Sequence, residues 1–205
     1  MFSIRYLFYD FVKITAAIPG LICFRPKLVY ENKKAKKKIR GGAMIVSNHV
    51  GFRDPVYLQF AVWYRRQHFV CLKKLFEGRA ALLFKGFLCI PIDREDMSMN
   101  SLRTIVSELK AGHVVSMFPE GHISEDENKR MGSFKSGMVL MAMQGKSPII
   151  PIYIKPKEHF YSRVVMAIGE PVDVCSILGN RPSLSAIDGV SAIIKEKEEK
   201  LKELV

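Results

Sequence analysis

The chain has 205 residues, of which 48% are hydrophobic, and a net charge of +12. This length suits one domain with a real core, and the apolar content excludes a disordered chain. The four cysteines are scattered without a C-x-x-C pair, so neither a zinc ribbon nor a disulfide framework is indicated, and we expect buried, reduced thiols in a cytosolic compartment.

Residues 1–24 are rich in aromatic and aliphatic side chains. The uninterrupted apolar run from Ile14 to Phe24 is too short to span a bilayer, and Pro19-Gly20 predicts a break between two segments. No small-residue cleavage site of the usual kind follows, so we do not expect a signal peptide. The segment either lies in the membrane interface or packs on the domain's own core, and we favour the membrane because a basic run follows directly.

The basic run extends from Arg25 to Arg40. It contains eight Lys or Arg residues and one acidic residue, Glu31, and so carries +7 of the total charge. Such a run suits nucleic acid, an anionic membrane surface or a solvated loop. The aromatic side chains lie in the preceding apolar segment and do not alternate with the lysines as a base-stacking surface requires. We therefore expect an anionic membrane surface and no nucleic acid.

After Gly41-Gly42, short apolar runs alternate with helical patterns. Helices are predicted at 55–68, around 73–86, and at 98–112, 134–144 and 185–205. Strands are predicted at 43–47, 69–72, 87–90, 113–118, 148–154 and 164–168, and the prolines in the fifth of these place it at an edge or a bulge. The alternation predicts an α/β fold with a mixed, largely parallel central sheet and helices packed on it, plus an N-terminal membrane-interacting helical segment.

The loop from Asn48 to Asp54 connects the first of these strands to the next helix, which is where α/β folds place chemistry. Histidine is the usual general base in proteins, and Asp54 is able to hold one ring nitrogen of His49, so the pair is a candidate general base. On the pair alone, the plainer alternative is that Asp54 caps the helix, with Pro55 at the first helical position, and that His49 is an ordinary loop residue.

Three further stretches follow this loop in the chain. In order and spacing, the four together resemble the glycerolipid acyltransferase family, specifically the 1-acylglycerol-3-phosphate acyltransferases, from about residue 34 to about residue 171. His-x4-Asp alone is a weak signal, whereas the four stretches in this order are a strong one, and Phe134-Lys135-Ser136-Gly137 also resembles a segment usual in that family. The four stretches are Asn48-His49-Val50-Gly51-Phe52-Arg53-Asp54, Gly86-Phe87-Leu88-Cys89-Ile90-Pro91-Ile92-Asp93-Arg94, Phe118-Pro119-Glu120-Gly121 and Ile149-Ile150-Pro151-Ile152.

The resemblance implies transfer of an acyl chain from a thioester, acyl-CoA or acyl-carrier protein, to the free sn-2 hydroxyl of 1-acylglycerol 3-phosphate (lysophosphatidic acid), giving phosphatidic acid. His49 would be the general base and Asp54 its orienting carboxylate. Residues 1–40 would form the apolar membrane-interacting segment and basic run, and residues 41–205 the acyltransferase domain, on the cytoplasmic face of a membrane. The residues that the resemblance assigns to substrate binding are Arg94, Glu120, Gly121, Asn48 and Lys135.

The chemistry of these residue types agrees with those roles. A guanidinium such as that of Arg94 binds a phosphate in two places, although this residue is also able to pair with Asp93 or Glu95. A thiolate leaving group needs no strong acid. Backbone N–H groups near Gly51 or Gly121 are candidates to stabilise the tetrahedral oxyanion.

Several features limit the assignment. There is no Gly-x-Ser-x-Gly motif, so direct transfer without an acyl-enzyme is expected. No ligand cluster predicts a metal or a cofactor, and the remaining histidines without a motif are expected to be structural. Gly51 stands where the family often has serine, and His122 stands where it often has a small residue. These two differences leave open a different lysophospholipid as acceptor. Glu120 has an alternative role, in which it binds no substrate and only maintains the shape of its loop. A basic nucleic-acid-binding protein is the remote alternative. The histidines without a motif are His68, His113 and His159.

Overall fold

The computed structural model of the chain describes residues 4–92, 99–119, 136–157, 159, 161–179 and 182–205. Seven strands form one sheet in the order β1-β7-β6-β2-β5-β3-β4. Every neighbouring pair is parallel except β6 with β7, so the predicted mixed, largely parallel sheet is confirmed. The strands are β1 (Lys27–Tyr30), β2 (Ala43–Ser47), β3 (Gln67–Leu72), β4 (Ile90–Ile92), β5 (Val114–Met117), β6 (Ile149–Ile154) and β7 (Val165–Ile168).

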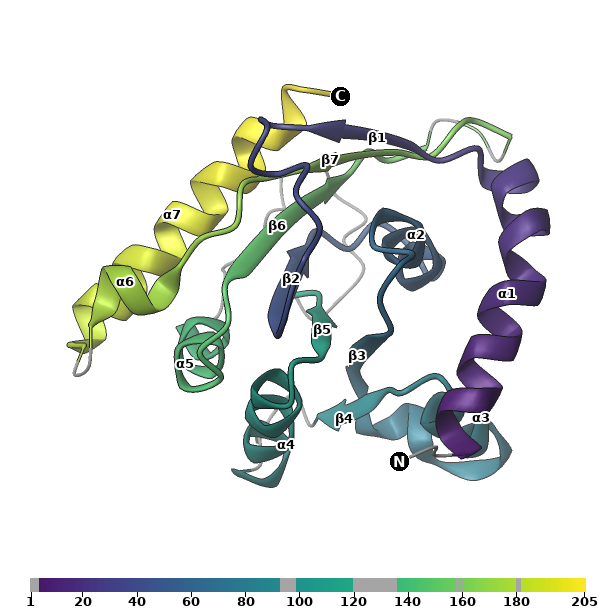
Figure 1. The fold of residues 1–205 in the computed structure, drawn as a ribbon, viewed down its shortest axis with the longest axis horizontal. Coiled ribbons are helices and arrows are strands. Elements are labelled where there is room, and N and C mark those ends of the chain that lie inside the picture. The colour runs from purple at the N-terminus through teal and green to yellow at the C-terminus, as the bar shows by residue number, and fades with distance from the viewer. Residues whose placement is uncertain (1–3, 93–98, 120–135, 158, 160, 180–181) are drawn as a thin grey trace.

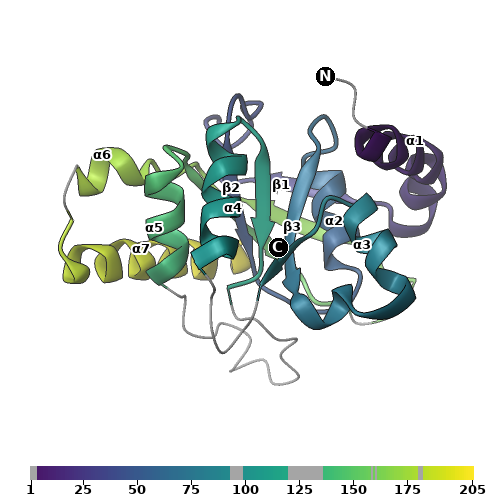
Figure 2. The same ribbon diagram turned by 90° about the horizontal axis from the view of Figure 1, so that it is seen from below.

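Helices cover both faces of the sheet, which gives three layers (Figures 1 and 2). On one face lie α4 (Met99–Lys110), α5 (Ser136–Gln144), α6 (Val174–Leu178) and α7 (Leu184–Lys202). On the other face lie α1 (Ile4–Phe24), α2 (Asp54–Ala61) and α3 (Ala81–Gly86), the last preceded by short 3-10 turns at Lys73–Phe76 and Gly78–Ala80. The two halves of the molecule therefore have separate apolar cores on opposite sides of one sheet.

Strand β2 is buried along its whole length and separates the two cores. Its alternate side chains, Met44 and Val46, pack into the cluster that includes α4, α5 and α7. Ala43 and Ile45 pack into the cluster that includes α2. Because a strand buried on both faces removes every second side chain from water on each side, β2 is the rigid centre of the fold.

Strand β6 lies in the interior of the sheet, so the edge position predicted from its prolines is wrong. The backbone carbonyl of Pro151 points toward β7, where it accepts the Gly169 N–H at 2.9 Å. The backbone nitrogen of Pro151 also faces β7, but the pairing of β6 with β7 does not begin until Ile152. The N–H group that proline lacks would therefore lie beyond the end of the β6–β7 pairing. The hydrogen bonds between β6 and β2 do not depend on it.

The N-terminal segment is one continuous helix, and the predicted break at Pro19-Gly20 is absent from it. Gly20 packs so closely on α2 that an added Cβ would come within 2.5 Å of the Phe60 ring. This contact directly after Pro19 supports the helix where the backbone loses a hydrogen bond. The apolar part of this helix is also longer than the predicted run from Ile14 to Phe24. By length and composition alone, Tyr6–Phe24 is long and apolar enough to cross a membrane.

Polar contacts hold α1 against the domain. The Tyr9 hydroxyl donates to Gln59 Oε1 and accepts the backbone N–H of Gln67 at 3.1 Å. The Asp10 carboxylate pairs with the Arg66 guanidinium at 2.6 and 2.9 Å. One side of α1 is therefore fixed to the turn between α2 and β3, and only its other side faces away from the protein.

Some boundaries differ from prediction for reasons of packing. The helix predicted at 55–68 ends at Ala61, because Gln67 and His68 belong to β3 and pair with β5. The strand predicted at 87–90 lies instead at 90–92, beside β3. Two short elements, β1 within the basic run and α6, are not predicted from the sequence. The four cysteines are free as expected, but Cys23 is exposed on α1 and the other three are half-buried.

Candidate active site

The candidate site lies on the loop that leaves the carboxyl end of β2. Asn48 begins this loop with its side chain buried, 1% exposed. Its amide donates to the Ile154 carbonyl at 2.9 Å and accepts the Ile154 N–H at 2.7 Å. Asn48 thus continues the pairing of β2 with β6 beyond the last strand residue and fixes the start of the loop. Its predicted contact with substrate stays a prediction.

Asp54 holds the loop together from its other end. One carboxylate oxygen, Oδ2, accepts three hydrogen bonds, from His49 Nδ1 at 2.8 Å, the Val50 N–H at 2.7 Å and the Gly51 N–H at 2.8 Å. The side chain is completely buried. A buried carboxylate needs such donors, because burial without them is costly.

The helix-cap interpretation of Asp54 is wrong. The residue that caps α2 is Arg53, through its backbone, and Asp54 is the first residue of the helix, with Pro55 second. The Asp54 side chain turns back to the N–H groups that precede it in the loop, not to the N–H groups of the helix. The start of α2 therefore fixes the carboxylate, and the carboxylate fixes the imidazole.

The His49 ring is oriented on two sides. Its Nδ1–H donates to Asp54, which leaves Nε2 as the proton-accepting nitrogen of the neutral ring. One ring face stacks on Phe118, with centroids 4.3 Å apart and planes 18° apart. The side chain is 19% exposed, so part of the ring remains open to solvent while the ring is held. Phe118 belongs to one of the motif stretches, but its role beneath His49 was not predicted, since it depends on β5 lying beside β2.

The Gly51 N–H is unsuitable as an oxyanion donor, contrary to expectation. It already donates to Asp54 Oδ2, as does the neighbouring Val50 N–H. Both groups serve to hold the carboxylate. The other candidate, Gly121, lies outside the described residues, as do Arg94, Glu120, Lys135 and His122. Their predicted roles stay predictions.

Positive charge gathers beside the loop, a feature that the motif analysis missed. Loss of hydration lowers the pKa of Lys157 below its ordinary value, and the positive charges of Arg53 and Arg25 lower it further. Arg53 lies in the loop between His49 and Asp54, whereas Arg25 follows α1 and Lys157 follows β6. Two arginines from distant parts of the chain therefore lie close enough to Lys157 to affect it, and one of them belongs to this loop.

The fold and the pair together describe an α/β protein with a hydrogen-bonded histidine–aspartate pair on the loop after a central strand. A model of the family described as Acyltransferase matches residues 27–155, which is more than half of the chain. The chain belongs to this acyltransferase family, and it is an acyltransferase.

Two relatives and one solved structure agree with this placement. A 1-acyl-sn-glycerol-3-phosphate acyltransferase of Bacillus subtilis (strain 168) is 31% identical over 173 residues, covering 80% of this chain and 84% of that protein. An enzyme of the same name from Streptococcus pneumoniae (strain ATCC BAA-255 / R6) is 29% identical over 144 residues, covering 65% of this chain and 51% of that protein. The crystal structure of the 1-acyl-sn-glycerophosphate (LPA) acyltransferase PlsC from Thermotoga maritima shares the fold, with a TM-score of 0.65 and 19% identity over 98% of this chain and 80% of that chain.

The second carboxylate oxygen of Asp54 suggests a stabilising substitution. Oδ1 is buried and has no hydrogen-bond partner among the described residues. A Cβ on Gly51 would lie 4.0 Å from Oδ1, with no closer contact. We expect Gly51→Ser to place a hydroxyl on Oδ1 and to raise the free energy of unfolding by about 1 kcal/mol, measured by denaturant titration. Gly51→Ala is the control, since it adds the Cβ without the hydroxyl; equal stabilisation by both would rule out the new hydrogen bond.

Proposed function

We propose that the protein transfers an acyl chain from a thioester donor, acyl-CoA or acyl-carrier protein, to the sn-2 hydroxyl of 1-acylglycerol 3-phosphate, giving phosphatidic acid. The observation that carries the proposal is the His49–Asp54 pair, buried at its carboxylate and partly exposed at its imidazole, in a chain of the acyltransferase family. The names of the two relatives support this acceptor.

The proposed reaction needs one base and no covalent intermediate. His49 Nε2 takes the proton from the acceptor hydroxyl as its oxygen forms a bond to the thioester carbonyl carbon. The tetrahedral intermediate then loses the thiolate as the carbon–sulfur bond breaks, and the imidazolium returns the proton to sulfur. Because a thiol has a pKa of about 8.5, the thiolate leaves without a stronger acid. In this scheme Asp54 keeps Nδ1 protonated and stabilises the imidazolium, a role that its 2.8 Å contact with Nδ1 supports.

The acceptor phosphate needs cations near the base. Arg94 and Lys135 are proposed for this purpose from the resemblance, and Glu120 and Gly121 are proposed to contact the same glycerol phosphate. The positive charges of Arg53, Arg25 and Lys157 beside the loop support an anionic substrate at the same place. Either the phosphate of the acceptor or the phosphates of the donor would be attracted there.

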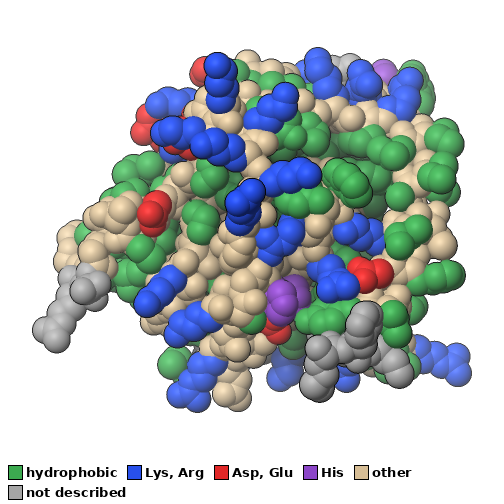
Figure 3. Space-filling model, viewed as in Figure 1, with side chains coloured by type: hydrophobic (Ala, Val, Ile, Leu, Met, Phe, Trp, Pro, Cys, Tyr) green, Lys and Arg blue, Asp and Glu red, His purple; other side chains and the backbone are tan. Residues whose placement is uncertain are grey.

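The membrane contact is proposed for the outer face of α1. Its exposed apolar side chains form one stripe that faces away from the domain, because the opposite side is docked on α2 and α3. Figure 3 shows hydrophobic side chains along the edge formed by α1, and Lys and Arg side chains on the adjoining surface. A helix docked along its length suits a position in the interface, on the cytoplasmic face where the thioester donors occur. The stripe consists of Leu7, Phe11, Ile14, Ile18, Leu21 and Ile22.

An acceptor panel tests the substrate assignment. Purified protein in mixed micelles is given radiolabelled acyl-CoA or acyl-carrier protein together with lysophosphatidic acid, lysophosphatidylethanolamine or lysophosphatidylcholine. We expect lysophosphatidic acid to be the best acceptor, because it alone presents a phosphate monoester, without a head group, to the cations. A higher kcat/KM for another lysolipid would mean that the substrate assignment is wrong and the related alternative is right.

Removal of the base tests the mechanism. We expect His49→Ala to lower kcat by about 10²–10⁴, the usual contribution of a general base. Asp54→Asn should also lower it, because the amide favours the wrong imidazole tautomer. His159→Ala is the control, since His159 is exposed and stacks on Tyr161. A loss below tenfold for His49→Ala, with circular dichroism unchanged, would contradict the proposed role.

Substitution of the stripe tests the membrane contact. Each large apolar side chain contributes about 1.5–3 kcal/mol when fully buried, so replacing Phe11, Ile14 and Ile18 by Ser should weaken binding to anionic vesicles by about 100-fold or more. The control replaces two exposed side chains elsewhere, Ile177 on α6 and Leu184 on α7. Equal binding by both variants, measured by vesicle co-sedimentation, would refute the role of α1.

A further inference from the structure

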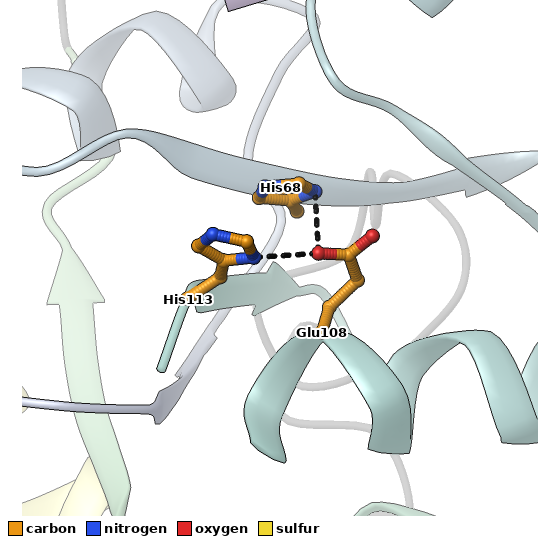
Figure 4. Close-up of side chains that lie close together, drawn as sticks. All are labelled: His68, Glu108 and His113. Carbon is orange, nitrogen blue, oxygen red and sulfur yellow. Dashed lines mark hydrogen bonds and ion pairs between the residues drawn. The ribbon is translucent and has the colours of Figure 1, made fainter. Parts of the chain in front are cut away.

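Three side chains that carry no sequence motif meet at the amino ends of β3 and β5. His68 is the second residue of β3, His113 directly precedes β5, and Glu108 lies in the last turn of α4 (Figure 4). Glu108 Oε2 lies 2.6 Å from His113 Nδ1 and 3.8 Å from His68 Nδ1. One ligand atom from each residue lies within 4.8 Å of the other two. From this juxtaposition we propose that His68, Glu108 and His113 bind a Zn²⁺ ion.

The donor set favours a transition-metal ion such as Zn²⁺ over Mg²⁺ and Ca²⁺. Two imidazole nitrogens and one carboxylate oxygen are ligands that Zn²⁺ takes, whereas Mg²⁺ and Ca²⁺ require oxygen alone. Zn²⁺ also imposes little geometric preference of its own. Three protein ligands leave a fourth position of the tetrahedron for water, and the His113 side chain, 35% exposed, lies at the solvent side of the cluster.

The backbone brings two of the ligands together before any metal binds. Gly112, with a φ of 84°, ends α4 in the left-handed conformation. The chain then turns back, and the His113 N–H donates to the Glu108 carbonyl at 3.0 Å. This turn places the His113 side chain over Glu108. The third ligand comes from the sheet, because His68 pairs with Val115 of β5.

Binding requires a small movement of the two less buried ligands. In a tetrahedral site with Zn–ligand bonds of about 2.0–2.1 Å, neighbouring donor atoms lie about 3.3 Å apart. The 2.6 Å contact must therefore lengthen and the 3.8 Å contact shorten. The two imidazole rings stack at 5.0 Å with planes 16° apart, so one ring must tilt toward the metal. His113 is the ring that tilts, since His68 is 1% exposed and fixed within the strand.

The position of the cluster separates it from the proposed chemistry. His113 and Phe118 lie at opposite ends of β5, about 16 Å apart at 3.3 Å per residue, and Phe118 is the residue that stacks on His49. The nearer neighbour is α1, where the Tyr6 ring lies 6.4 Å from the His113 ring and beneath Arg66. The ion would connect β3, α4 and the start of β5 below the first turns of the membrane-contacting helix, and its role would be structural.

Zinc titration of the full chain tests the proposal. Chelator-treated protein in detergent micelles is titrated with ZnCl₂ in a calorimeter, and its thermal unfolding is followed with and without the ion. We expect one Zn²⁺ to bind per chain and to raise the unfolding temperature. MgCl₂ should neither bind in the calorimeter nor change the unfolding temperature. His113→Ala and Glu108→Gln should each weaken Zn²⁺ binding at least about tenfold.

The controls separate this site from adventitious binding. His159→Ala removes an exposed histidine outside the cluster and should bind Zn²⁺ like the unaltered protein. Glu108→Gln keeps the shape of the side chain, so its effect does not depend on how well the alanine variant folds. Absence of one-to-one Zn²⁺ binding, or equal affinity in all variants, would overturn the proposal and leave a hydrogen-bonded His–Glu network.

Discussion

The site depends on one carboxylate oxygen that accepts three hydrogen bonds. Asp54 Oδ2 binds the imidazole of His49 and two backbone N–H groups of the loop between them, all within 2.8 Å. The loop is therefore folded around a buried carboxylate, and the shape of the loop and the orientation of the His49 ring have the same cause. The anion is tolerable in a dry place because its donors compensate for lost hydration. Any change that moves the first turn of α2 also moves His49.

The order of the strands supplies the remaining contacts that hold the loop. β2 lies between β6 and β5 with both neighbours parallel to it, so the carboxyl ends of three strands meet at one edge. From β6 comes the Ile154 backbone that holds Asn48, and after β5 comes Phe118, which stacks on His49. All three strands are covered by an apolar core on each face of the sheet. The loop therefore begins from closely packed strands, which deform little.

The opposite edge of the sheet carries a different set of contacts. There, Glu108 and His113 hold the end of α4 to the sheet, and the Asp10–Arg66 pair holds α1 to the turn before β3. The docked side of α1 is polar or closely packed, and its outer side is apolar. The apolar outer side of α1 and the loop that carries His49 thus belong to one framework, with the histidine cluster near the start of α1.

The sequence by itself determined the α/β class, most of the elements and the pair His49–Asp54, because these depend on local periodicity and on residue spacing within one loop. Predictions from the sequence were wrong where contacts between distant segments determine the structure. Pro151 is tolerated in an interior strand because the N–H group that proline lacks would lie past the end of the β6–β7 pairing. Helix α1 continues through Pro19 because Gly20 packs on Phe60. Nor do local patterns show which N–H groups a carboxylate occupies, or that His68 and His113 lie together. Those facts required the tertiary structure, since only the folded sheet brings residues separated by tens of positions within hydrogen-bonding distance.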